Sequence, residues 1–122
     1  MKLQNAFITE RNAIGNYSVI GYEMASTTNF NYDELAANKN WTEGTTALST
    51  TAVTGWQAVA KVALNDCDLG STWALQLAKD SNGSGAAYDG GIKDGTGSVT
   101  FGAYDIACAS LTGAFKTVAD NN

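Results

Sequence analysis

The sequence predicts a small α+β protein, and three features lead to this class. A helix is expected over about residues 2–17, where apolar residues recur at spacings of three and four. Two apolar stretches, 56–64 and 72–78, flank a turn, and their apolar residues alternate with a period of two. The third feature is a single pair of cysteines in a chain with 13 glycines and only 16% charged residues, a composition that suits a small exported domain.

Composition and charge exclude several classes of function. The 122 residues suit one domain, 1–122, with a core of ordinary size. The net charge is −5 and no basic cluster is present, which argues against nucleic acid and an anionic membrane as partners. The chain has no histidine, so it lacks the most common general base and the most common zinc ligand. We therefore expect no enzyme activity, no cofactor and no metal site.

The expected first helix has one apolar stripe that should pack on a sheet. Its packing face comprises Leu3, Phe7, Ile14 and Tyr17. No capping residue precedes Leu3, which predicts a helix cut open at its start. The sequence contains neither a signal peptide nor a run of about 20 apolar residues, so the chain as it stands should be soluble.

A long variable loop is expected over 18–54, because this segment is dominated by Asn, Thr, Ser and Gly. Its aromatic residues should pin it to the core. A short helical turn is expected at 33–37, and an edge strand within 44–54. Trp41 is the candidate for a surface aromatic that could stack on a sugar ring.

The sheet and the disulfide-bounded region are expected over 55–122. Residues 72–78 alternate as a strand with one buried face, whereas 56–64 fits a strand or a helix; the simplest interpretation is a β-hairpin. Residues 79–97 should form a flexible excursion, followed by a further alternating stretch at 98–101. The expected core consists of Trp56, Trp73, Leu75, Val99 and Phe101.

Cys67 and Cys108 are 41 positions apart, and two interpretations of the pair are open. They form one disulfide, or they are two separate buried thiols in a cytosolic protein. The polar, glycine-rich composition favours the disulfide.

Two acidic motifs have structural interpretations that outweigh chemical ones. The sequence from Asp80 to Gly85 begins like a calcium loop, but Gly91 stands where such a loop is closed by glutamate. Solvated turn residues are therefore favoured over a calcium site at 80–94. Asp66 and Asp68, on either side of Cys67, are likewise interpreted as turn residues.

In these segments the chain resembles the globular headpiece of a type IV pilin whose hydrophobic N-terminal half-helix is missing. KLQNAFITERNAIGNYSVIGYE resembles the continuation of the long first helix of such proteins, and GWQAVAKVALNDC, STWALQL and CASLTGAF resemble parts of the headpiece. The resemblance covers most of the chain except 23–54 and 79–97.

The resemblance implies that 56–64 is a strand and that a Cys67–Cys108 disulfide encloses the C-terminal region. It also implies a structural subunit of a bacterial type IV pilus, an extracellular filament for adhesion or motility. Such a subunit would assemble with others through the missing helix, with the help of pilus assembly machinery. It would reside in the inner membrane before assembly and on the cell surface afterwards. The alternatives are a pseudopilin of a type II secretion system and a secreted carbohydrate-binding module.

Overall fold

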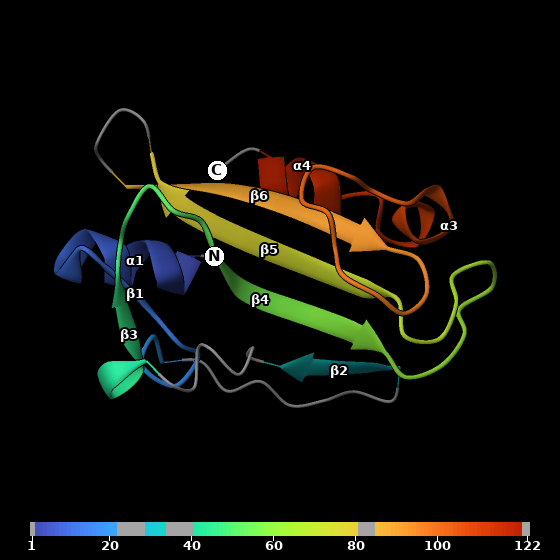
Figure 1. Cartoon of the computed structure of the whole chain (residues 1–122), viewed down its shortest axis with the longest axis horizontal. Helices are drawn as coiled ribbons and strands as arrows, with labels where there is room; N and C mark the ends of the chain where they lie inside the picture. The colour runs from blue at the N-terminus through green and yellow to red at the C-terminus, as the bar shows by residue number, and fades with distance from the viewer. Residues whose placement is uncertain (1, 22–28, 34–40, 81–84, 121–122) are drawn as a thin grey trace.

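A four-stranded antiparallel sheet is the framework of the protein, in a computed structural model that describes residues 2–21, 29–33, 41–80 and 85–120 (Figure 1). The strand order is β2–β4–β5–β6, with β2 at Phe30–Asp33, β4 at Val53–Ala60, β5 at Thr72–Lys79 and β6 at Ala86–Lys93. A second, two-stranded antiparallel sheet pairs β1 (Ala13–Gly15) with β3 (Thr45–Ala47). The helical elements are α1 (Lys2–Arg11), η1 (Thr42–Gly44), α3 (Ile106–Ala109), η2 (Ser110–Thr112) and α4 (Phe115–Asp120). The predicted α+β class is confirmed.

The central hairpin of β4 and β5 is also confirmed. Trp73 pairs with Ala58 and Leu75 pairs with Trp56, in antiparallel register. Trp73 and Leu75 are 2% and 7% exposed, so these two members of the expected core are buried. Strand β4 ends at Ala60 rather than at residue 64, since the following residues 61–63 are exposed.

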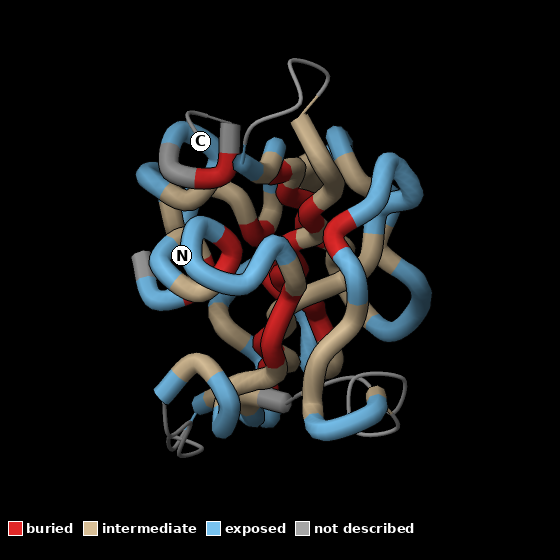
Figure 2. Tube along the Cα trace, turned by 90° about the vertical axis from the view of Figure 1, so that its left-hand side faces the viewer, coloured by how far each residue is buried: buried red, intermediate tan, exposed pale blue. Residues whose placement is uncertain are grey.

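The two faces of the four-stranded sheet differ in what covers them. We call the face that carries Trp73, Leu75 and Leu77 the inner face, and the face that carries Gln57, Gln76 and Asp89 the outer face; strand alternation and register separate them. Buried residues of α1, β1 and α4 pack with Leu75, Leu77 and Tyr88 on the inner face. Cys108 of α3 packs there with Trp73 and Ile92. Figure 2 shows these buried segments in the middle of the molecule.

The first helix is shorter than predicted. It ends at Arg11, because Asn12 takes a left-handed conformation (φ 53°) and the next three residues form β1. Ile14 is 1% exposed as predicted for a core residue, but it is buried from a strand. Tyr17 is half-buried in the turn after β1.

The buried face of α1 also differs from the predicted one. Leu3 is 43% exposed, and Phe7 is half-buried with the guanidinium of Arg11 5.8 Å from its ring centre. The residues that α1 buries are Gln4 and Ile8. The apolar pattern pointed to a different stripe because Gln4, a polar residue, is buried through its hydrogen bonds.

Gln4 holds α1 to β1 by a pair of hydrogen bonds. Its side-chain amide donates to the carbonyl oxygen of Gly15 (2.8 Å), and its amide oxygen accepts from the Gly15 N–H (3.0 Å). The Gln4 side chain thus makes the two hydrogen bonds with the Gly15 backbone that a neighbouring strand would make. Strand β3 pairs with β1 at residues 13–15. Both ends of a buried amide are satisfied, which is the condition for burying it without a large cost.

The segment 79–97 is not a flexible excursion, because its middle part is strand β6, paired with β5 over eight positions from Thr72–Lys93 to Lys79–Ala86. Two adjacent glycines obscured the strand pattern, and packing on both faces requires them. A side chain at Gly90 would meet Ala119 of α4 at 2.7 Å on the inner face. A side chain at Gly91 would meet Val99 at 2.5 Å on the outer face.

The expected strand at 98–101 is absent, since this stretch is a loop that crosses the outer face beside Gly91. Val99 and Phe101 are half-buried in this loop, so they do not face inward with Trp73 as predicted. The chain then runs along the edge of β6, where Gly102 N–H donates to Gly90 O and Ile92 N–H donates to Ala103 O. This contact covers an edge that would otherwise expose unpaired backbone groups.

The expected long loop, 18–54, contains β2, η1 and β3 in its described part. Its expected edge strand corresponds to β3, although β3 pairs with β1 and not with the larger sheet. The expected helical turn at 33–37 falls mainly outside the described residues, and Asp33 itself ends β2. In the described parts of the chain, none of the helices has the length and apolar character needed to cross a bilayer.

Replacing Gln4 by leucine should destabilise the protein by about 2–4 kcal/mol, because the N–H and C=O of Gly15 would lose their partners in a buried site. Equilibrium urea unfolding measures this loss. Gln76→Leu is the matched control, since Gln76 is half-buried on the outer face, and it should change stability by about 0.5 kcal/mol or less. A Gln4→Leu protein as stable as the control would contradict the role of this amide.

Tyr88 should make the protein sensitive to alkaline pH. Its hydroxyl donates to Asn5 Oδ1 (2.7 Å) and so links β6 to α1, and burial raises the pKa of Tyr88 to about 12. Burial disfavours the ionised form of Tyr88. The stabilisation that the neutral side chain gives the fold is therefore complete below pH 10 and is lost as the pH rises from 10 to 12. The free energy of unfolding should fall by about 1–2 kcal/mol over this range.

The matched comparison for this pH effect is Tyr88→Phe, which lacks the ionisable hydroxyl. Urea unfolding at several pH values should show a smaller fall for this variant than for the original chain. Parallel curves for the two proteins would contradict the assignment to Tyr88.

Candidate functional site

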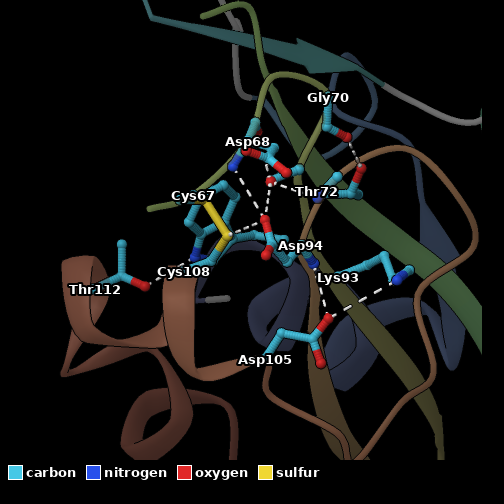
Figure 3. Close-up of a disulfide and its surroundings, with 12 residues drawn as sticks. Cys67, Asp68, Gly70, Thr72, Lys93, Asp94, Asp105, Cys108 and Thr112 are labelled. Carbon is cyan, nitrogen blue, oxygen red and sulfur yellow. Dashed lines mark hydrogen bonds and ion pairs between the residues drawn. A yellow bond between two sulfur atoms is a disulfide. The ribbon is translucent and has the colours of Figure 1, made fainter. Parts of the chain in front are cut away.

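A network of polar side chains and backbone groups surrounds a disulfide at one end of the sheet (Figure 3). Cys67 and Cys108 are bonded, with an S–S distance of 2.02 Å and a Cα–Cα distance of 4.8 Å, and both are fully buried. The structure thus has the disulfide that composition favoured and the resemblance implied. The bond joins the β4–β5 connection to α3, and these segments meet at the right-hand end of Figure 1.

A tight turn presents Cys67. Leu64 and Cys67 exchange two backbone hydrogen bonds (2.7 and 2.9 Å), with Asn65 in a left-handed conformation between them. Asn and Asp tolerate such turns, which is why the sequence Asn65-Asp66 is suitable here. The interpretation of Asp66 and Asp68 as turn residues agrees with this geometry.

Cys108 is positioned by the start of α3. The carbonyl oxygen of Asp105 accepts hydrogen bonds from the N–H groups of Cys108 (3.1 Å) and Ala109 (2.9 Å). The Asp105 carboxylate does not cap this helix. It accepts instead from the Asp94 N–H (2.9 Å) and lies 4.0 Å from Lys93 Nζ, so it fixes the end of β6 to the start of α3.

Asp94 points its carboxylate at the disulfide, as Figure 3 shows. Its Oδ1 atom lies 3.7 Å from Cys108 Sγ and accepts a hydrogen bond from the Asp68 N–H (3.0 Å). Because a sulfur in a disulfide carries no proton, the contact with Cys108 is van der Waals and electrostatic and is not a hydrogen bond. From the sequence, Asp94 is only the last residue of the segment 80–94, where solvated turn residues are favoured, and no local pattern marks its position beside the sulfur.

Ser71 completes this network from a fully buried position. Its Oγ accepts from the Gly95 N–H (2.8 Å) and lies 2.6 Å from the Asp68 carbonyl oxygen and 3.3 Å from Asp94 Oδ1. A hydroxyl has one proton, and the shorter distance assigns it to the Asp68 carbonyl. Ser71 therefore ties the β4–β5 turn to the turn after β6.

Cys67, Cys108 and Asp94 also form a group of potential metal ligands among the described residues, with ligand atoms within 4.8 Å of one another. Thiolates bind metals, and both sulfurs here are consumed by the disulfide. The oxidised site therefore does not offer the donor set that a metal ion requires.

The motif at 80–94 that begins like a calcium loop, for which solvated turn residues were favoured, lies only partly within the described residues. Residues 81–84 lie outside the described residues. Asp89 is in β6, paired with Gln76 on the outer face, and Asp94 is engaged at the disulfide. These two carboxylates therefore have separate structural settings.

Aromatic side chains join two hydrophobic clusters on the inner face. One cluster contains Ile8, Ile14 and Leu77, and the other contains Trp73, Ile92 and Cys108. Trp56, placed in the expected core, is half-buried and packs against both clusters. Its ring lies 6.2 Å from that of Tyr32 and 6.1 Å from that of Phe115. Trp41, the candidate surface aromatic, is also half-buried and packs on one side against the cluster that contains Ile8 and Ile14.

No protein-family model, curated protein or solved structure matches this chain.

Removing the disulfide should lower the free energy of unfolding by about 4 kcal/mol, because the bond closes a long loop in the unfolded chain. The change is Cys67→Ala combined with Cys108→Ala, measured by urea unfolding. Hydrogen exchange should show protection lost first in α3 and α4, since the bond holds this end of the chain to the β4–β5 turn.

The control for this prediction is a reductant added to both proteins. It should destabilise the original chain and leave the double variant unchanged. Equal thermal stability of the original chain with its disulfide intact and after reduction, with both free thiols verified by alkylation, would contradict the prediction.

Proposed function

We propose that this chain is the headpiece of a bacterial type IV pilin and serves as a structural subunit of an extracellular filament. The observation that carries the proposal is the position of α1, which lies on the inner face of the antiparallel sheet and leaves the outer face to other contacts. A subunit built in this way presents α1 to one side, and to the other side it presents the outer face of the sheet with the loop at 98–101 beside Gly91. This two-sided arrangement suits packing around a filament axis.

The disulfide is a second support for the proposal. It staples the C-terminal segment, with its short helices α3 and α4, to the β4–β5 connection. Disulfides persist in oxidising surroundings such as the cell surface. A bond of this kind therefore suits a subunit that is displayed outside the cell.

The proposal requires that the mature protein contains a further, apolar helix. A helix of about 20 apolar residues should precede Lys2, anchor the subunit in the inner membrane before assembly and bury itself among other subunits afterwards. Partners are then other copies of the subunit and the assembly machinery.

The N-terminus of the natural protein is the decisive measurement. Material sheared from cell surfaces is purified with an antibody against the recombinant chain, and the N-terminal peptide is sequenced by mass spectrometry. We expect an apolar helix that continues into Lys2-Leu3-Gln4. Immunogold labelling of intact cells with the same antibody should decorate filaments.

Other outcomes separate the alternatives. An apolar helix without surface filaments, together with lost protein export on gene deletion, would indicate a pseudopilin of a secretion system. A mature chain that begins near Leu3 after a cleaved secretory signal would overturn the filament proposal. The carbohydrate-binding alternative would then be tested on a glycan array, with variants of the half-buried Trp41.

A further inference from the structure

The negative charge beside the disulfide is a feature that the filament proposal does not use. Asp94 Oδ1 lies 3.7 Å from Cys108 Sγ, and both its oxygen and the two sulfurs fall within 4.8 Å of one another. The carboxylate is held in this position by the Asp68 N–H and by the Asp105 carboxylate, which accepts from the backbone N–H of Asp94. Its proximity to sulfur is therefore fixed by the fold.

Lys93, the cation that ends β6, does not cancel this charge. Lys93 Nζ lies 4.0 Å from the Asp105 carboxylate, and both side chains are 42% exposed, so this cation is directed to Asp105. Asp66 and Asp68 are exposed on the turn that carries Cys67 and add negative charge on that side. The described surroundings of the disulfide are thus acidic.

We propose that Asp94 acts as an electrostatic guard that protects the Cys67–Cys108 bond from reduction by thiols. In the reaction that it opposes, an external thiolate attacks Cys67 Sγ and forms a mixed disulfide with it. The Cys67–Cys108 bond breaks, and its electron pair leaves as a thiolate on Cys108 Sγ. That new negative charge forms beside the Asp94 carboxylate.

Two effects follow from the same charge. A sulfur that departs as a thiolate next to a carboxylate is a poorer leaving group, because like charges at this separation repel. Attack on Cys108 itself brings the external thiolate toward the same carboxylate and is opposed at the approach. The protection goes beyond the proposed filament function and does not depend on it.

The test compares two thiols of similar size that differ in charge. 2-Mercaptoethanol is neutral before ionisation, whereas 2-mercaptoethanesulfonate carries an additional negative charge. Because both cysteines are fully buried, either thiol reaches them through the same local opening of the protein. The ratio of the two reduction rates, followed by alkylation of the released thiols and mass spectrometry, therefore isolates the electrostatic contribution.

Asp94→Asn is the test variant, since asparagine keeps the oxygen that accepts from the Asp68 N–H. We expect reduction by 2-mercaptoethanol to accelerate about 3- to 10-fold. We also expect the rate ratio, sulfonate thiol over neutral thiol, to rise about threefold. Near-UV circular dichroism of the oxidised variant checks that its packing is intact.

Asp89→Asn is the matched control. It removes the same charge from strand β6, on the outer face, whereas Asp94 lies in the turn that follows this strand, and it should leave the ratio unchanged. If Asp94→Asn only loosened the structure, both rates would rise by one factor and the ratio would stay constant, which would overturn the proposal. An equal change of the ratio in both variants would overturn it too, since net charge and not position would then be responsible.

A measurement on the original chain does not depend on the folding of any variant. Sodium chloride at about 0.5 M screens charges beyond a few ångströms. It should raise the ratio of the original chain toward that of Asp94→Asn. A ratio that salt leaves unchanged would count against the guard.

Discussion

Burial of the inner face of the β4–β5 hairpin is the constraint on which the rest of the structure depends. Trp73 and Leu77 are 2% exposed, and no single element covers them. The cover is assembled from α1, β1, α3 and α4, none of which exceeds ten residues. Helices this short are unstable by themselves in water, so their stability comes from the sheet on which they pack. Sheet and cover therefore stabilise each other, and specific cross-links must fix the position of each short segment.

Those cross-links lie at the two ends of the sheet and differ in kind. At the α1 end they are neutral hydrogen bonds: the Gln4 amide to Gly15, and the Tyr88 hydroxyl to Asn5. At the α3 end the link is covalent, and the indole N–H of Trp73 adds a hydrogen bond to Thr112 Oγ1 (2.8 Å). A ten-residue helix offers enough surface for packing and hydrogen bonds to hold it. The four residues of α3 bury little apart from Cys108, with Ile106 86% exposed, so this segment depends on the bond.

Sequence reasoning succeeded where the pattern is local and failed where a distant partner decides. The alternation of Trp73, Leu75 and Leu77 is sufficient to predict β5 because it reports burial directly. The end of α1 was missed because Ala13–Gly15 gains its strand partner about 30 positions further along the chain, at β3. Strand β6 was missed for a related reason: Gly90 and Gly91 weaken a strand locally, but α4 and the loop at 99–101 need the space that these residues leave. Composition favoured the disulfide; the position of Asp94 beside it follows from tertiary packing alone.

The acidic surroundings of the disulfide fit the kind of protein that the filament proposal describes. A subunit displayed outside the cell cannot be repaired by cytosolic chaperones, and small thiols such as glutathione carry net negative charge near neutral pH. In this fold the disulfide holds Cys108 of α3 against Trp73 and Ile92, so its loss should weaken the cover over these two residues. The Asp94 carboxylate, fixed near Cys108 Sγ, opposes that loss without adding bulk to a buried site. Because the proposed guard involves only residues of this chain, it would serve equally in a pilus, a pseudopilus or a secreted module, and its test is independent of which of these functions the chain has.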